Sequence, residues 1–185
     1  MEERAMAHFE TLRQDVRDEV KRRIEQRDKY SIQLSLALTA LVAVSFSTTG
    51  LRAVLIAAPL VSIYFTVLIL YSYRVHHVLA KYLREEIEPE LARLYGTPRD
   101  KEWETYYAKQ KHVVPGIRQQ FFLYALWGVT VLSLLYLWLM ERNSLGIPVL
   151  IAVTVIYIGV DALITWIIKR FRKEEETHER LATKA

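Results

Sequence analysis

The chain has 185 residues, of which 52% are apolar and 25% are charged, and its formal net charge is +4. Charged and apolar residues lie in different parts of the chain: residues 32–70 contain one charge, residues 121–168 contain three, and the other 42 lie elsewhere. A helix needs about 20 apolar residues to cross the hydrocarbon core of a bilayer. The composition therefore predicts an all-α integral membrane protein and excludes a soluble enzyme.

The first 29 residues predict an amphipathic helix that continues unbroken into the first membrane span. Charged residues fill the intervals between apolar residues spaced three or four apart, which are Phe9, Leu12, Val16, Val20 and Ile24. This spacing places the apolar side chains on one face of a helix. The segment has 8 basic and 8 acidic residues, which is typical of a solvated helix surface and not of a nucleic-acid-binding groove.

Each of the two apolar stretches is about twice the length of one span and is interrupted near its middle, at residues 47–50 and 141–146. Gly50 and Gly146 suit the ends of helices, and Pro148 suits a first helical turn. We therefore predict four transmembrane helices in two hairpins, over residues 30–48, 51–73, 117–140 and 147–168.

The segment after the second span predicts further helix outside the membrane. Apolar residues recur at helical spacing from Val75 to Leu94, and Pro89 predicts a bend or break. Thr97 and Pro98 begin a second helix-start pattern. We expect a helical cytoplasmic layer, which serves either as a folded support or oligomerisation stalk, or as a control or docking surface. The residues for the second role are Tyr82, Arg84, Glu85, Trp103 and Tyr106.

The distribution of basic residues predicts the orientation. Residues 1–29, 74–118 and 169–185 hold 8, 9 and 6 Lys and Arg, whereas the two short turns hold one each. Basic residues favour the cytoplasmic side. We expect a multi-pass protein of the bacterial inner membrane with both termini in the cytoplasm. Its five parts are the helix 1–29, the hairpin 30–73, the cytoplasmic segment 74–116, the hairpin 117–168 and the charged tail 169–185.

Asp161 is the most informative single residue, because it lies about seven residues from the inner end of the last predicted span. A carboxylate at that depth costs about 2.5 to 3.5 kcal/mol and needs a partner or a watery cavity. It predicts an ion-coordinating or proton-accepting site, or part of an acidic ring around a pore; equally, it could be a structural acid that joins helices. Depth matching suggests four partners, Gln33, Ser35, Thr66 and Tyr124.

A ladder of small residues follows the first span at intervals of four, at Ser31, Ser35, Thr39, Ala43 and Ser47. Small residues at this interval allow membrane helices to approach closely. We expect helix packing at this face. A pore lining is the alternative, although a ladder with this spacing drifts by about 40° per step around a straight helix.

Familiar catalytic chemistry is not predicted. The chain has no cysteine and no phosphate-binding loop, zinc-protease or nucleophile-elbow motif. The adjacent His76 and His77 do not have the i, i+4 spacing of a metal site. We expect no enzyme activity, no cofactor, no metal cluster and no nucleic-acid partner.

The run Tyr82-Leu83-Arg84-Glu85-Glu86-Ile87-Glu88-Pro89-Glu90-Leu91, followed by Trp103-Glu104-x-Tyr106, resembles a pattern in small uncharacterised bacterial four-span membrane proteins. The layout is also loosely similar to that of membrane effectors of phage-defence systems, including those linked to RNA-targeting CRISPR loci. This resemblance implies oligomeric pore formation or membrane disruption under cytoplasmic control.

Two functions follow from the sequence. The first is a homo-oligomeric channel-like or membrane-perturbing protein, with Asp161 near the conduction path and the cytoplasmic helices as the control element. One chain of four spans encloses too little space for a pore, so conduction requires several copies. The alternative is a non-conducting scaffold in the lipid bilayer that recruits a soluble cytoplasmic protein.

Overall fold

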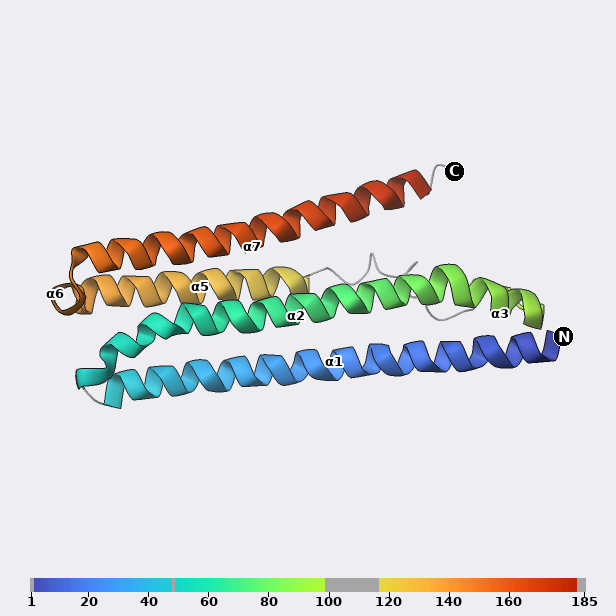
Figure 1. Cartoon of the computed structure of the whole chain (residues 1–185), viewed down its shortest axis with the longest axis horizontal. Helices are drawn as coiled ribbons and strands as arrows, with labels where there is room; N and C mark the ends of the chain where they lie inside the picture. The colour runs from blue at the N-terminus through green and yellow to red at the C-terminus, as the bar shows by residue number, and fades with distance from the viewer. Residues whose placement is uncertain (1, 48, 99–116, 183–185) are drawn as a thin grey trace. The chain divides into compact units, whose positions relative to one another are not determined.

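The computed structural model describes residues 2–47, 49–98 and 117–182, and all regular secondary structure in these ranges is helical. The prediction of an all-α chain is confirmed. Figure 1 shows the helices, which are α1 (Glu2–Ser47), the 3-10 helix η1 (Thr49–Ile56), α2 (Ala57–Tyr82), the π-helix η2 (Leu83–Ile87), α3 (Glu88–Tyr95), α5 (Ile117–Met140), α6 (Arg142–Leu145) and α7 (Ile147–Ala182).

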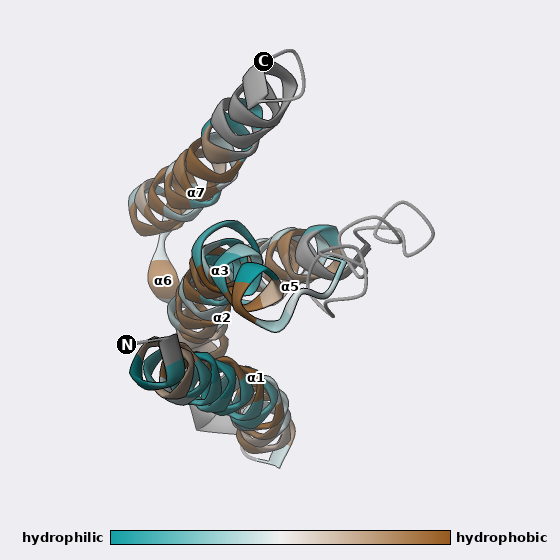
Figure 2. Ribbon diagram, turned by 90° about the vertical axis from the view of Figure 1, so that its right-hand side faces the viewer, coloured by the Kyte–Doolittle hydropathy of each residue, from teal (hydrophilic) through white to brown (hydrophobic). Residues whose placement is uncertain are grey.

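Four helical segments of the described chain are long and apolar enough to span a membrane, and they are Glu3–Ser47, Ala53–Tyr95, Gln120–Met140 and Ile147–Phe171. Many large apolar side chains on them are exposed, Leu36, Leu132 and Leu139 among them. Lipid stabilises such a surface better than water does. In Figure 2, α3 and the beginning of α1 are mostly hydrophilic, whereas α5 and most of α7 are hydrophobic. The predicted number of candidate spans is therefore confirmed.

The helix boundaries differ from the prediction in two places. The second apolar helix begins as η1 and becomes α-helical only at Ala57, instead of at Leu51. Pro59 explains this offset, because it has no N–H to donate to the carbonyl of Leu55 and α-helical bonding cannot extend past it toward the N-terminus. The last helix does not end at Ile168 but continues to Ala182.

The chain divides into two compact units, which we describe separately. Unit 1 consists of residues 1–33 and 67–119, and unit 2 consists of residues 34–66 and 120–185. The helices α1 and α2 each contribute to both units, since each continues without a break through the boundary.

Unit 1 contains a small apolar core between the beginning of α1 and the segment from α2 to α3. Its buried residues are Val16, Leu83, Ile87 and Leu91, with Phe9, Leu12 and Leu79 packed against them. The apolar periodicity read from residues 1–29 and 74–94 is thus the packing face of an antiparallel helix pair. Near the end of this pair, the Tyr95 hydroxyl donates a 2.9 Å hydrogen bond to Glu10.

Pro89 changes the helix without breaking it. It follows η2, in which the Glu88 N–H bonds to the Leu83 carbonyl, five residues earlier instead of four. A proline in a continuous α-helix would clash with the carbonyl four residues before it and would leave that carbonyl without its donor. The wider π turn accommodates the ring. The helix then ends at Gly96, whose φ of 63° suits a residue without Cβ.

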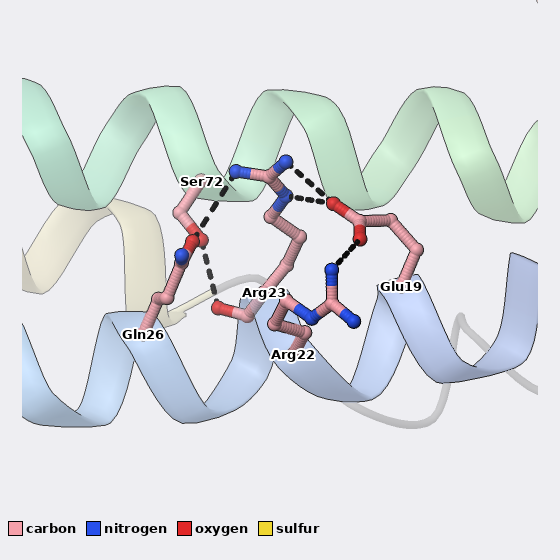
Figure 3. Close-up of polar contacts among 5 residues, drawn as sticks. All are labelled: Glu19, Arg22, Arg23, Gln26 and Ser72. Atoms are coloured by element: carbon pink, nitrogen blue, oxygen red, sulfur yellow. Dashed lines mark hydrogen bonds and ion pairs between the residues drawn. The ribbon is translucent and has the colours of Figure 1, made fainter.

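Polar contacts extend the pairing of α1 and α2 beyond the apolar core (Figure 3). The Ser72 hydroxyl donates a 2.8 Å hydrogen bond to the Arg23 carbonyl, and the Arg23 side chain bonds to Glu19 and Gln26 on its own helix. One turn further, the guanidinium of Arg27 lies 4.2 Å from the ring centre of Tyr73. Arg27 is buried, so the cation–π contact compensates part of its lost hydration.

The second helix-start pattern of the sequence lies largely outside the described residues. Thr97 and Pro98 follow α3 as non-helical residues. The helix expected after them, with Trp103 and Tyr106, falls within residues 99–116, which the structure does not describe.

The core of unit 1 is testable by truncation. Ile87→Ala removes a fully buried side chain and should destabilise unit 1 by about 2 to 5 kcal/mol. Val78→Ala, at a residue that is 59% exposed, should change stability by less than about 0.5 kcal/mol. Denaturant unfolding of the detergent-solubilised chain measures both. Equal effects of the two variants would contradict the assigned core.

Candidate functional site

Two tryptophan–threonine pairs join α5 to α7 in unit 2. Trp127 Nε1 donates a 3.0 Å hydrogen bond to Thr165, and Trp138 Nε1 donates a 3.0 Å hydrogen bond to Thr154. Each threonine in turn donates to the carbonyl four residues before it on α7. The helices run antiparallel (Figure 1). In both pairs the two residue numbers add up to 292, so both pairs belong to the same antiparallel register.

The spacing within each helix explains why both pairs form. Trp127 and Trp138 are eleven residues apart, as are Thr154 and Thr165. Eleven residues make about three helical turns, so both members of each set lie on one helix face. Tryptophan N–H groups in apolar surroundings need an acceptor, and the threonines supply it. The two bonds therefore fix the register of α5 against α7.

Asp161 lies between these two pairs and is completely buried. The register places it opposite positions 130 and 131 of α5, and the Thr130 hydroxyl lies beside its carboxyl group. The contact between them does not have the geometry of a full hydrogen bond, however, and neither carboxyl oxygen has a well-formed hydrogen bond to the described residues. A buried carboxyl without a partner costs folding free energy unless a proton or a cation neutralises it.

Other buried hydroxyl groups occur in the candidate spans of unit 2. Ser62 and Thr66 are four residues apart on α2, and Thr130 and Ser133 are three apart on α5. Each pair lies on one face of its helix. Thr66 and Thr130 resemble Asp161 in one respect, because their buried side-chain oxygens also have no hydrogen-bond partner. Unit 2 thus contains a polar interior made by α2, α5 and α7.

Of the four partners suggested for Asp161, only Thr66 is buried in unit 2. Tyr124 is 73% exposed, and Gln33 and Ser35 are exposed on α1. Tyr124 was suggested because it lies seven residues after Ile117, just as Asp161 lies seven residues before Ile168. Position 117 is instead level with position 175 in the observed register, because α7 continues past Ile168.

Thr130 is the neighbour that the sequence analysis missed. The matching eleven-residue intervals of the tryptophans and threonines are visible in the sequence. Together with an antiparallel arrangement, they would have placed Thr130 beside Asp161.

The small-residue ladder of α1 does not form a buried packing face within the chain. Ser35, Thr39, Ala43 and Ser47 are exposed, and Ser31 is partly buried. Three of the hydroxyls bond to carbonyls of α1 itself: Ser31 to Arg27, Thr39 to Ser35 and Ser47 to Val44. These residues therefore leave a smooth, exposed surface of small side chains.

The proposed control residues of the segment after α2 lie on the surface of unit 1. Tyr82 is 40% exposed, and Glu85 accepts from Arg84 at 3.1 Å and pairs with Lys81 at 3.7 Å. Exposed pairs of this kind contribute little to stability. Trp103 and Tyr106 lie outside the described residues. The surface at Tyr82 and Glu85 is accessible.

Within the described ranges, no group of three or more His, Cys, Asp or Glu side chains could hold a metal ion. Asp161 is the residue of the candidate spans that combines complete burial with an ionisable group and no partner. A single carboxyl with neighbouring hydroxyls can bind a proton or a hard cation.

No protein-family model, curated protein or solved structure matches this chain. The resemblance to small four-span proteins and phage-defence effectors therefore stays a prediction.

A double-mutant cycle tests the α5–α7 register. Trp127→Phe and Thr165→Val each remove one hydrogen-bonding partner, and their coupling should be about 0.6 to 1.7 kcal/mol, the range for hydrogen bonds between membrane helices. The matched control combines Trp127→Phe with Thr154→Val, which bonds to Trp138 instead, and its coupling should be close to zero. Unfolding in mixed detergent measures both cycles, and equal couplings would refute the register.

Proposed function

We propose that this protein is a multi-pass membrane protein that conducts or releases ions as a homo-oligomer, with Asp161 as its intramembrane ion site. The observation that carries this proposal is the Asp161 carboxyl group, which is completely buried and has no hydrogen-bond partner. An ionisable side chain inside a membrane span is costly, and spans retain one mainly where an ion or proton pathway needs it.

The described conformation corresponds to a closed state in this proposal. Asp161 has no exposed surface, so an ion reaches it only after the helices of unit 2 separate. The continuous helices α1 and α2 supply a mechanical route for control, because each contributes both to unit 1, which carries the exposed control residues, and to unit 2, which holds Asp161. A partner that binds near Tyr82 or Glu85 would therefore act on helices that continue into unit 2.

The exposed small residues of α1 support assembly of several copies. Thr39, Ala43 and Ser47 present short side chains, and the hydroxyls of Thr39 and Ser47 are already bonded to their own helix. Such a face allows a second helix to approach closely in a bilayer. Assembly also addresses the size of the chain, since one copy with four candidate spans encloses too little space for a pore.

We place the protein in the bacterial inner membrane with both termini in the cytoplasm, on the basis of its Lys and Arg distribution. The absence of cysteine from the chain makes single-cysteine labelling clean. Asn143→Cys should react with a membrane-impermeant maleimide on intact spheroplasts, and Glu85→Cys should react only after permeabilisation. Labelling of both from the outside would refute this topology.

Ion flux from liposomes tests the function. The purified chain should release ions from vesicles as a defined oligomer, and Asp161→Asn should change the cation flux by at least about tenfold, which corresponds to 1.4 kcal/mol. Glu25→Gln is the matched control, because it removes the same charge from an exposed residue of α1, and it should leave the flux unaltered. Unchanged flux in an Asp161→Asn oligomer of normal mass would remove Asp161 from the mechanism.

A non-conducting scaffold is the second candidate function. It is favoured by the exposure of Tyr82 and Glu85 on unit 1, where a soluble cytoplasmic protein could bind. In that case Asp161→Asn would alter only stability, and vesicles containing the folded protein would not leak. The flux experiment therefore separates the two candidates.

A further inference from the structure

Two threonines of unit 2 depart from the way in which hydroxyl groups are bonded elsewhere in the candidate spans. A helical serine or threonine commonly donates to the carbonyl three or four residues before it. Five hydroxyls of unit 2 do so at 2.7 to 3.0 Å, and they are Thr39, Ser45, Ser47, Thr154 and Thr165. Thr66 and Thr130 donate to no carbonyl, although both are almost completely buried. Their lone pairs are available to a ligand.

Thr66 and Thr130 lie at about the same level in unit 2 as Asp161. Thr130 lies beside the carboxyl group, as described above. For Thr66, the level follows from Tyr157, whose hydroxyl donates a 2.7 Å hydrogen bond to the Ile56 carbonyl. The beginning of α2 and α7 run in the same direction (Figure 1).

The distances along the two helices then agree closely. Thr66 lies ten residues after Ile56, or about 15 Å along α2, and Asp161 lies four residues after Tyr157, or about 6 Å along α7. The Tyr157 side chain reaches back toward the N-terminus of α7 by roughly 6 Å. Thr66 and Asp161 therefore lie within about one helical turn of each other along the axis of unit 2.

We propose that Asp161, Thr66 and Thr130 form a binding site for a single monovalent metal cation of the sodium type. Their four side-chain oxygens are buried, and none has a well-formed hydrogen bond to a group in the described part of the chain. Oxygen ligands of this kind suit hard cations.

The single negative charge of the site determines which valence of cation it binds. Asp161 supplies one negative charge, and it is the only ionisable side chain among these three residues. One monovalent cation makes the site neutral, whereas a divalent cation would leave a net positive charge buried in apolar surroundings, which is strongly unfavourable. A proton on the carboxyl group would also make the site neutral. It needs only one acceptor, whereas a metal cation takes ligand oxygens from all three residues, so a proton and a cation depend on different side chains.

This inference names the ion class for the site of the proposed function, and its test does not use ion flux. The full chain, purified in detergent, is unfolded by heat in sodium chloride and in choline chloride of equal ionic strength. Since a ligand that binds only the folded state stabilises it with saturating concentration dependence, the melting temperature should rise with sodium and reach a plateau. Lithium and potassium chloride, tested in the same way, rank the preferred cation.

Variants assign the ligands. Thr66→Val and Thr130→Val should each raise the sodium concentration for half-maximal stabilisation by about tenfold, because each removes one ligand oxygen. Asp161→Asn should abolish the sodium response. Thr39→Val is the matched control, since Thr39 is exposed and bonds to its own helix, and it should keep the sodium response of the natural chain.

The opposite results would overturn the inference. Equal melting temperatures in sodium, lithium, potassium and choline, with stability that changes only with pH, would make Asp161 a proton site. A full sodium response in both threonine variants would place the cation elsewhere. Flux from liposomes without any cation-dependent stability would refute this site alone, and cation-dependent stability without flux would refute the proposed conduction alone.

Discussion

Hydrogen bonding inside apolar surroundings is the constraint on which the rest of unit 2 depends. Every polar group that is removed from water must find a partner in the chain. The helices satisfy the backbone, and several serine and threonine hydroxyls bond to the backbone of their own helix, those of Thr39, Ser45, Thr154 and Thr165 among them. The tryptophans of α5 use two of these threonines as acceptors. Against this background, unbonded oxygens at Asp161, Thr66 and Thr130 mark the place where another species completes the structure.

The sequence predicts the helical architecture well, because that architecture depends on local properties. Apolar runs interrupted at residues 47–50 and 141–146 are enough to give four candidate spans, and apolar spacing before and after them gives the antiparallel pair of unit 1. Pro89 was recognisable as a perturbation, but its form as a π turn depends on how Leu83, Ile87 and Leu91 pack against α1. Such packing is a tertiary property, so residue spacing alone does not determine it.

The candidate site was predictable only in part. Asp161 is conspicuous because it is a carboxylate within an apolar run, and Thr66, one of the four partners suggested by depth, is buried in unit 2. Thr130 was missed and Tyr124 was included because depth was counted from assumed span ends, while the true register is set by side-chain bonds eleven residues apart. The ladder of α1 shows the same limit: its spacing identifies a smooth face, but not the neighbour that this face contacts.

The π turn at η2 also determines how straight the apolar row of unit 1 is. Residues four apart in an α-helix are offset by about 40° around the axis, so a row of such residues winds gradually away from a straight partner. A π turn has more residues per turn and advances less per residue, which offsets this winding. Leu83, Ile87 and Leu91 are spaced four apart across the boundary of η2 and α3, and all three are buried. The π turn therefore compensates for the winding, and the apolar residues spaced four apart stay aligned with α1.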